Sequence, residues 1–524
     1  MRTCDLSGQC YTPAVMGNTH SAAGSGRTGS DPRPHAVVIG SGFGGLAAAV
    51  RLGARGYRVT VLERLDAPGG RAYVHRQDGY TFDAGPTIVT APFLLEELWS
   101  LAGRRLADDI DLRPLDPFYR VTFADGSHFD CRAREEDAKA EVARLSPGDV
   151  AGYERFMRAS EAIYKVGFEQ LGHVSFDSWR DMARIVPDML KLGSHRSLHS
   201  MVASHVRDPR LRFVLSFHPL FIGGNPFNVT SIYGLISHLE RRHGVHFAMG
   251  GTGSLVNGLV NLVEGQRGEV RLGAEVAEIT VSGRTATGVR LASGERIAAD
   301  VVVSNADPAW TYGRLLGGVT RRRWSDRRLA RQRYSMGVFV WYFGTRRRYE
   351  QVPHHTIMVG PRYRELLDDI FRRKVLADDF SLYLHRPTAT DPSLAPHGCD
   401  AFYVLSPVPH LGADVDWTER AEPYRRAISR HLEATLLPGL ESELTTSLVT
   451  TPLDFRDRLC AVNGAAFSFE PVLTQSAWFR PHNRSEEIDR LYLVGAGTHP
   501  GAGVPGVISS ARVLDALVPD ARAA

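Results

Sequence analysis

The sequence predicts a mixed α/β fold in which a parallel sheet is assembled from discontinuous segments, with an α+β region inserted between them. Short runs of apolar, β-branched residues occur at 36–39 and 58–62, and similar runs recur at 301–304 and 491–494. Such runs are typical of strands buried on both faces. Helical stretches separate them, and strands that alternate with helices form parallel sheets. At 524 residues the chain is also too long for one hydrophobic core, so at least two domains are expected.

A glycine-rich turn directly follows the first of these strands. Gly40, Gly42 and Gly45 satisfy the pattern G-x-G-x-x-G, and a helix is predicted after them at 46–52. The first glycine permits a tight turn, the second lets the backbone approach a pyrophosphate, and the third lets helix and strand pack closely. The second strand ends in Glu63, 18 residues after Gly45 and close to the roughly 20 expected of an acid that binds ribose hydroxyls. A lone motif could be an accidental turn, but this order of strand, helix, strand and acid predicts a Rossmann-like dinucleotide site.

The pattern along the chain divides it into two interleaved regions. Units of strand and helix return after the middle of the chain and again near its C-terminus. The dinucleotide-binding domain is therefore predicted to comprise 35–105, 245–310 and 485–520. The intervening segments, 106–244 and 311–484, are predicted to form a substrate domain that contacts membrane.

Composition excludes several functional classes. Lys and Arg number 62 against 58 Asp and Glu, a net charge of +4, whereas a nucleic-acid binder should be dominated by basic residues on one face. The five cysteines are odd in number and form no C-x-x-C, so a disulfide framework or a cysteine zinc site is not expected. His354 and His355 are adjacent, the wrong spacing for two ligands on one helix face, so no metal site is predicted. Residues 1–34 are rich in Gly, Ser, Thr and Pro and are predicted to be a disordered tail.

The stretch 213–239 is unusually apolar, although glycines and a proline at 223–226 interrupt it. It could be ordinary core, the wall of a long apolar tunnel, or a face that dips into a membrane. No segment approaches the roughly 18 consecutive apolar residues of a membrane-spanning helix, and the N-terminus lacks a signal-peptide core. A cytoplasmic location is therefore expected.

Longer motifs identify a family resemblance. From about residue 36 to 518 the chain resembles bacterial-type phytoene desaturases, which belong to the FAD-dependent amine oxidase superfamily. The resemblance rests on the glycine fingerprint together with the stretches at 63–64, 68–72, 81–87, 223–227, 360–366, 380–385, 469–484 and 495–507.

The resemblance implies FAD as the cofactor. Gly70 and Arg71, in the second glycine turn, are expected to contact the FAD pyrophosphate, because the planar fork of arginine binds phosphate oxygens bidentately. Val276 is expected to give the adenine a backbone contact, although its side chain alone suggests only a strand residue. A helix start near the C-terminus should direct N–H groups at the flavin ring. The residues predicted for this role are Gly497, Pro505, Gly506 and Val507.

The resemblance also implies the reaction. Phytoene and partly desaturated carotenes would be converted in successive steps towards lycopene by hydride transfer to flavin N5, with oxygen or a quinone as terminal electron acceptor. The enzyme would associate peripherally with the inner membrane, where its substrate resides. Asp181 and Arg184 are catalytic candidates, since they lie at i and i+3 on a predicted helix at 176–189. The alternative for this pair is a surface ion pair.

Three other functions remain open on the sequence. A related desaturase could stop at neurosporene or act on a diapocarotene, because the number of steps depends on the shape of the tunnel. An amine oxidase shares the fold but needs polar recognition of an amine. A non-catalytic escort of prenylated proteins also shares it, but need not keep all the glycine motifs that persist here.

Overall fold

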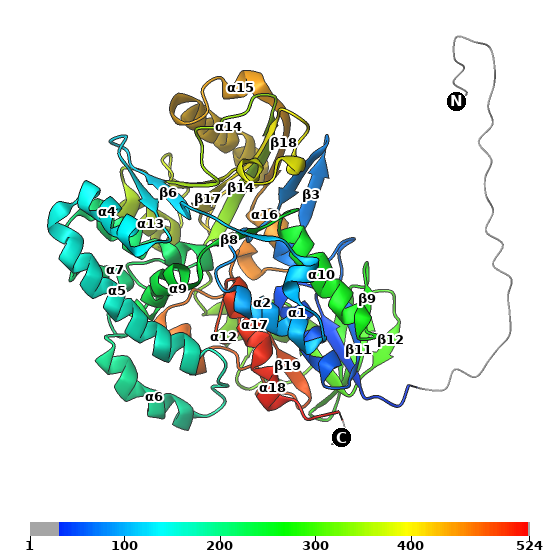
Figure 1. Cartoon of the computed structure of the whole chain (residues 1–524). Helices are drawn as coiled ribbons and strands as arrows, with labels where there is room; N and C mark the ends of the chain where they lie inside the picture. The colour runs from blue at the N-terminus through cyan, green and yellow to red at the C-terminus, as the bar shows by residue number, and fades with distance from the viewer. Residues whose placement is uncertain (1–30, 522–524) are drawn as a thin grey trace, which may run out of the picture. The chain divides into compact units, whose positions relative to one another are not determined.

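A five-stranded parallel sheet organises the first region of the structure, a computed structural model that describes residues 31–521 (Figure 1). Its central strand β1 is entirely buried and pairs with β13 on one side and β2 on the other. In spatial order the strands are β19 (Leu491–Leu493), β13 (Val301–Ser304), β1 (His35–Ile39), β2 (Arg58–Leu62) and β9 (Glu269–Arg271). The sheet thus draws its strands from stretches that are more than 400 residues apart in the chain.

The two faces of this sheet are covered differently. Alternate residues of β1 point to opposite faces: Val38 packs against helices, whereas Val37 and Ile39 pack against a small β-sheet. The helices α1 (Phe43–Ala54), α10 (Thr252–Gly265) and α17 (Val504–Arg512) lie beside one another on the first face (Figure 1). The second face is covered by a three-stranded meander of β10 (Val276–Ser282), β11 (Thr285–Leu291) and β12 (Arg296–Ala298).

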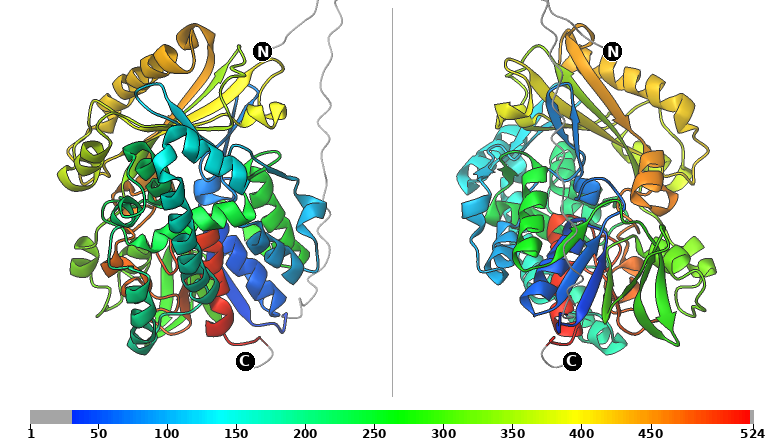
Figure 2. Two further views of the ribbon diagram at one scale, coloured as in Figure 1. Left: turned by 60° about the vertical axis from the view of Figure 1, so that its left-hand side comes forward. Right: turned by 90° about the vertical axis from the view of Figure 1, so that its right-hand side faces the viewer.

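A seven-stranded sheet organises the second region. Its pairs are antiparallel except for β15 and β6. In order the strands are β18 (Leu444–Thr450), β14 (Gly337–Thr345), β17 (Asp400–Val408), β16 (Leu382–His385), β15 (His355–Met358), β6 (Tyr119–Thr122) and β7 (His128–Cys131). Helix α14 (Trp417–Thr435) lies along one face of these strands, above the elements of the first region (Figure 2).

Alternate residues of strand β14 point to opposite faces of this sheet, and the two faces have different neighbours. Phe339, Trp341 and Phe343 pack under α14. Val338 and Val340 point to the opposite face, where they line a cavity. The second region therefore presents one face of its sheet to the first region.

The remaining elements connect these two sheets. Two small antiparallel pairs are β3 (Val74–Gln77) with β4 (Tyr80–Asp83), which are consecutive strands, and β5 (Leu112–Pro114) with β8 (His246–Ala248), which are distant in the chain. The other helices are α2 (Pro92–Leu101), α3 (Leu106–Asp109), α4 (Glu135–Leu145), α5 (Val150–Tyr164), α6 (Trp179–Lys191), α7 (Leu198–Ala203), α8 (Pro209–Ser216), α9 (Leu235–His243), α11 (Pro308–Trp310), α12 (Asp326–Ala330), α13 (Tyr363–Asp368), α15 (Leu440–Glu443), α16 (Pro452–Leu459) and α18 (Leu514–Leu517).

The structure revises three predicted helices. Helix α1 covers Phe43–Ala54 rather than 46–52, and α6 covers Trp179–Lys191 rather than 176–189. Helix α17 starts at Val504 rather than near 507, because Gly503 adopts a positive φ of 93° and ends the preceding loop. Pro505 and Gly506 therefore lie within the first helical turn, where proline's missing N–H costs nothing. The predicted tail falls mostly outside the described residues. Over 31–521, no helix has both the length and the apolar character needed to cross a bilayer.

Candidate functional site

A cavity of about 510 Å³ lies between the two sheets. One end is lined by the glycine turns that follow β1 and β2, and the other by apolar side chains of the second region. Most of the predicted cofactor residues line it: Gly40, Gly42, Glu63, Gly70, Arg71, Val276, Pro505, Gly506 and Val507. The tertiary structure therefore brings together residues from five separate positions along the sequence.

The first glycine turn comes so close to neighbouring backbone and side chains that larger residues do not fit. A Cβ added to Gly42 would lie 2.9 Å from Asn305 Nδ2. One added to Gly45 would lie 2.0 Å from the carbonyl oxygen of Gly40, although Gly45 does not line the cavity. Gly45 thus packs the helix start against the turn, while Gly40 and Gly42 border the cavity. No side chain within 31–521 caps α1, so its first N–H groups remain available to an anion.

Glu63 is buried, and its hydrogen bonds stabilise the same turn. Its Oε2 accepts hydrogen bonds from the backbone N and the hydroxyl of Ser41, at 2.9 and 2.7 Å, and Oε1 accepts one from the Leu65 N at 3.0 Å. Ser41 Oγ also accepts from the Gly69 N at 3.3 Å. The acid therefore connects the first glycine turn to the second, in addition to facing the cavity.

Arg71 supplies a cationic group to this end of the cavity. Within the described part of the chain it makes one hydrogen bond, from Nε to the Ala466 carbonyl at 2.6 Å, so its terminal nitrogens remain available. Burial lowers the pKa of the Arg71 guanidinium, and the carboxylate of Asp307 acts in the opposite direction. Burial likewise raises the pKa of Asp307, against the influence of Arg71. One hydrogen bond thus holds the Arg71 side chain, and the terminal nitrogens of its guanidinium are available to a ligand in the cavity.

The C-terminal glycine turn divides into a lining part and a packing part. Pro505, Gly506 and Val507 line the cavity from the first turn of α17, which has no side-chain cap among the described residues. Gly497 does not line it: an added Cβ there would lie 2.2 Å from Pro308 Cδ. Its small size serves close packing, and its contact with the cofactor stays a prediction.

Asp181 and Arg184 are not brought to the cavity. Helix α6 turns Met182, Ile185 and Met189 toward it, while Asp181 is half-buried and Arg184 is exposed. Among the described residues, these two side chains form no ion pair with each other. Their catalytic role stays a prediction, and the cavity wall offers no contact in its favour.

The second half of the cavity is predominantly apolar. Part of its wall comes from the stretch 213–239, including Leu220, Ile232 and Leu235, which agrees with the tunnel-wall interpretation of that stretch. Val340 and Leu405 of the seven-stranded sheet face it from the other side. A long hydrocarbon would therefore meet apolar surface beyond the glycine turns.

One buried polar cluster interrupts this apolar wall. Glu240 Oε1 accepts a hydrogen bond from Tyr119 OH at 2.8 Å, and Oε2 lies 3.0 Å from His218 Nε2. Glu240 and His218 are each 5% exposed, and both line the cavity. Both carboxylate oxygens are thus engaged by protein groups.

Sequence reasoning did not single out two residues that shape the site. Asn305 follows β13 at its carboxyl end, where ligands bind in open α/β sheets, and this position could have identified it. Arg480 is fully buried and donates to four backbone carbonyls: Gln475, Phe469, Ala496 and Thr498. Only the fold shows that these carbonyls meet, since they lie on two separate loops.

Comparison with known proteins decides the family. A model described as flavin containing amine oxidoreductase matches residues 43–513. The chain belongs to this family. The phytoene desaturase (neurosporene-forming) of Cereibacter sphaeroides is 55% identical over 93% of this chain and 95% of its own length. The phytoene desaturase (lycopene-forming) of Pseudescherichia vulneris is 51% identical over 92% of this chain and 98% of its own.

Solved structures agree on the fold of this flavoprotein. An oxidoreductase from Methanosarcina mazei gives a TM-score of 0.61 at 18% identity, covering 92% of this chain and all of that one. Putrescine oxidase gives 0.59 at 14% identity, covering 93% and 99%. At such identities the likeness concerns the fold alone.

The residues present fit an FAD. Uncapped helix N-termini and Arg71 suit the pyrophosphate, and Gly42 lines the cavity at a point where a side chain would not fit. The buried Glu63 suits the ribose, and the start of α17 suits the flavin ring. Two predicted residues, Gly45 and Gly497, do not line the cavity. Their small size instead allows close packing around the site.

Proposed function

We propose that this protein is an FAD-dependent phytoene desaturase that carries out successive desaturations of phytoene towards lycopene. The observation that carries the proposal is the apolar cavity, which continues directly from the dinucleotide turns. Relatives named phytoene desaturases are 49–55% identical to this chain over more than 90% of its length. The terminal acceptor would be oxygen or a quinone.

The residues of this chain would act mainly by positioning the substrate. When bound, FAD supplies the hydride acceptor at N5 while the neighbouring carbon loses a proton. The apolar wall, including Leu220, Ile232 and Val340, would hold the polyene and exclude water. The Glu240–His218 pair would place a polar group beside the hydrocarbon.

Two alternatives from other classes receive less support. An amine oxidase needs a polar group for its amine, yet the carboxylate of the apolar half is already bonded by Tyr119 and His218. A prenyl-protein escort need not keep a flavin site, whereas here the residues for pyrophosphate, ribose and ring converge on one cavity. Flavin absorption bands in the purified protein would argue further against an escort.

A neurosporene-forming enzyme is the second candidate for the end product. Two relatives named neurosporene-forming are 55% and 52% identical to this chain, and three named lycopene-forming are 51%, 50% and 49% identical. These values are too close to select a product. Our prediction remains lycopene.

Expression in cells that supply phytoene tests the function and the product together. We expect a coloured polyene, with lycopene as the main species by chromatography and absorption. Neurosporene as the main species would support the second candidate. Unchanged phytoene in cells that contain folded, FAD-loaded protein would contradict the substrate assignment.

Helix α6 supports peripheral attachment to the inner membrane. Trp179, Val186 and Leu190 are 65%, 39% and 58% exposed, while Met182 and Ile185 line the cavity from the same helix. The helix carries three basic side chains, Arg180, Arg184 and Lys191, against the two acidic ones of Asp181 and Asp188, and this small cationic excess suits the surface of an anionic bilayer. In this proposal the membrane-facing part would be α6, at the lower left of Figure 1, where it would admit substrate from lipid.

Replacing Trp179 and Leu190 by serine should weaken binding to anionic phospholipid vesicles by about tenfold or more, because burying each side chain contributes about 1.5–3 kcal/mol. Co-sedimentation measures the bound fraction. The double variant Leu272→Ser/Val375→Ser is the matched control, since these residues are 46% and 50% exposed outside α6. Equal losses in the two double variants would argue against α6 as the contact.

A further inference from the structure

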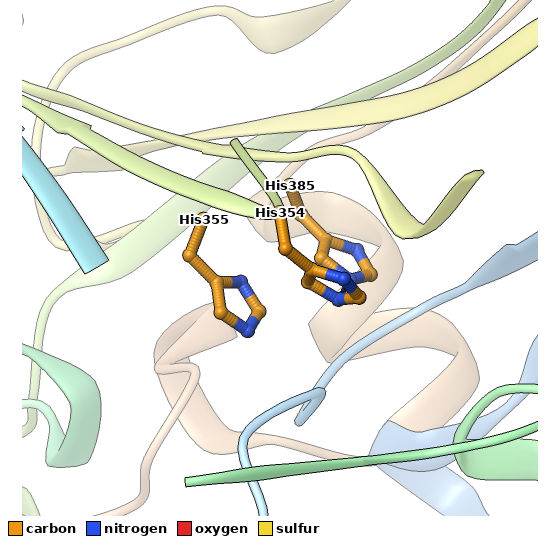
Figure 3. Close-up of side chains that lie close together, drawn as sticks. All are labelled: His354, His355 and His385. Carbon is orange, nitrogen blue, oxygen red and sulfur yellow. Dashed lines mark hydrogen bonds between the residues drawn. The ribbon is translucent and has the colours of Figure 1, made fainter. Parts of the chain in front are cut away.

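Three buried histidines gather behind the cavity wall. His355 of β15 and His385 of β16 are directly opposed across an antiparallel pair, and His354 immediately precedes β15. Side chains opposed in this way leave the sheet on the same face. Figure 3 shows all three rings extending from the strands to the same side. One ring nitrogen from each lies within 4.8 Å of the others.

The spacing of the rings approaches that of metal ligands. His354 Nε2 lies 3.1 Å from His385 Nε2, in a hydrogen bond that an ion between the two rings would replace. Two nitrogens on a tetrahedral Zn²⁺ with bonds of about 2.0–2.1 Å are separated by roughly 3.3–3.4 Å. A small rotation of the third imidazole would close the remaining distance, since the terminal torsion of histidine is soft.

Hydroxyl groups orient two of the rings from behind. His354 Nδ1 lies 2.6 Å from Thr390 Oγ1, and His355 Nδ1 lies 2.7 Å from Tyr383 OH. Bonds of this kind select the tautomer of metal-binding histidines and leave Nε2 for the ion. In the described part of the chain, His355 Nε2 is buried without a hydrogen-bond partner, as is His385 Nδ1. A buried polar atom without a partner calls for an explanation, and an ion would supply one for His355.

The electrostatic setting permits a cation. A neutral imidazole keeps a lone pair on one ring nitrogen, which is the form that binds a metal ion. The nearby Arg386 is bonded to Asp400 at 2.9 Å, which compensates its charge. Imidazole is a preferred ligand of Zn²⁺.

We propose that His354, His355 and His385 bind a divalent transition-metal ion, Zn²⁺ in the first instance. Three protein ligands leave one position for a water or hydroxide. The ion would link strands β15 and β16 and fix the orientation of the His355 ring. This ring is hydrogen-bonded to Tyr383 OH at the cavity wall. Its role would therefore be to stiffen the wall, and it does not depend on which substrate occupies the cavity.

Sequence reasoning excluded this site for an identifiable reason. It treated His354 and His355 as neighbours on a helix, where adjacent residues diverge. On a strand that begins at 355, the partner is His385 across the sheet, 30 positions further along the chain.

Metal analysis of the full-length holoenzyme tests the proposal. Protein from zinc-supplemented cells would be dialysed and analysed by plasma mass spectrometry as wild type, His355→Gln, His385→Gln and the control His410→Gln. His410 is 8% exposed and bonds Lys374, outside the cluster. We expect about one Zn²⁺ per chain in wild type and control, and at least a tenfold loss in the two cluster variants.

A second measurement does not depend on the folding of any variant. Removal of zinc from the wild type with a chelator should lower its melting temperature, and added Zn²⁺ should restore it. Co²⁺ in place of Zn²⁺ should give absorption bands at longer wavelength than those of the flavin. Wild type that holds no zinc and shows no zinc-dependent melting would overturn the proposal, as would equal zinc in wild type and cluster variants.

Discussion

Gly42→Val should abolish FAD retention. A Cβ at this position would lie 2.9 Å from Asn305 Nδ2 and 3.8 Å from the Gly69 carbonyl oxygen, and the two further methyl groups of valine would have to be accommodated at this edge of the cavity. Overpacking of this kind costs about 1–3 kcal/mol before any loss of phosphate contacts is counted. The FAD content of the purified variant, measured by the ratio of flavin to protein absorbance, should therefore fall about tenfold or more.

The matched control for this change is Gly318→Val. Gly318 is exposed, and among the described residues an added Cβ there meets no atom within 4 Å. Its FAD content should equal that of the wild type. If Gly42→Val also kept its full FAD content, the assignment of the first glycine turn to the pyrophosphate would be wrong.

Arg480→Lys should lower the free energy of unfolding by about 3–5 kcal/mol. The guanidinium donates from Nε to Gln475 O at 2.8 Å and from Nη2 to Phe469 O at 3.0 Å, and Nη1 reaches Ala496 O and Thr498 O at 3.3 and 3.4 Å. Lysine carries its three donors on one atom and cannot serve groups spread around a planar fork. The carbonyls of Ala496 and Thr498, in the C-terminal glycine turn, would lose their partner.

Urea denaturation followed by circular dichroism measures this loss, and FAD content reports on the turn. The same substitution at an exposed position, Arg426→Lys, is the control; the Arg426 side chain is 64% exposed and pairs with Glu422. Exposed pairs contribute about 0–1 kcal/mol, so the control should change stability little. Similar unfolding free energies for the two variants would show that Arg480 does not hold the loops together.

The sequence predicted those parts of the site that depend on local backbone chemistry. Glycines at 40 and 42, the acid at 63 and the glycine–arginine pair at 70–71 are readable because a phosphate-binding turn needs particular residues at particular spacings. Their positions on one cavity follow from the strand order β19-β13-β1-β2-β9, which places the carboxyl ends of these strands together.

Other features could not be read from the chain because they depend on packing between distant segments. Packing against Pro308 requires glycine at 497, and nothing near residue 497 in sequence indicates that contact. Asp181 and Arg184 occupy helical positions that could form a pair, but the rotation of α6 decides which side chains meet the cavity.

The sequence by itself determined that this chain builds a dinucleotide site and resembles flavin-dependent desaturases, because turn geometry and charge are properties of short segments. Only the tertiary structure decided where the apolar cavity runs, which polar pair interrupts it and that three histidines converge behind it. These features are made by side chains from strands and helices far apart in the chain, and their meeting is set by sheet register and helix rotation rather than by local sequence.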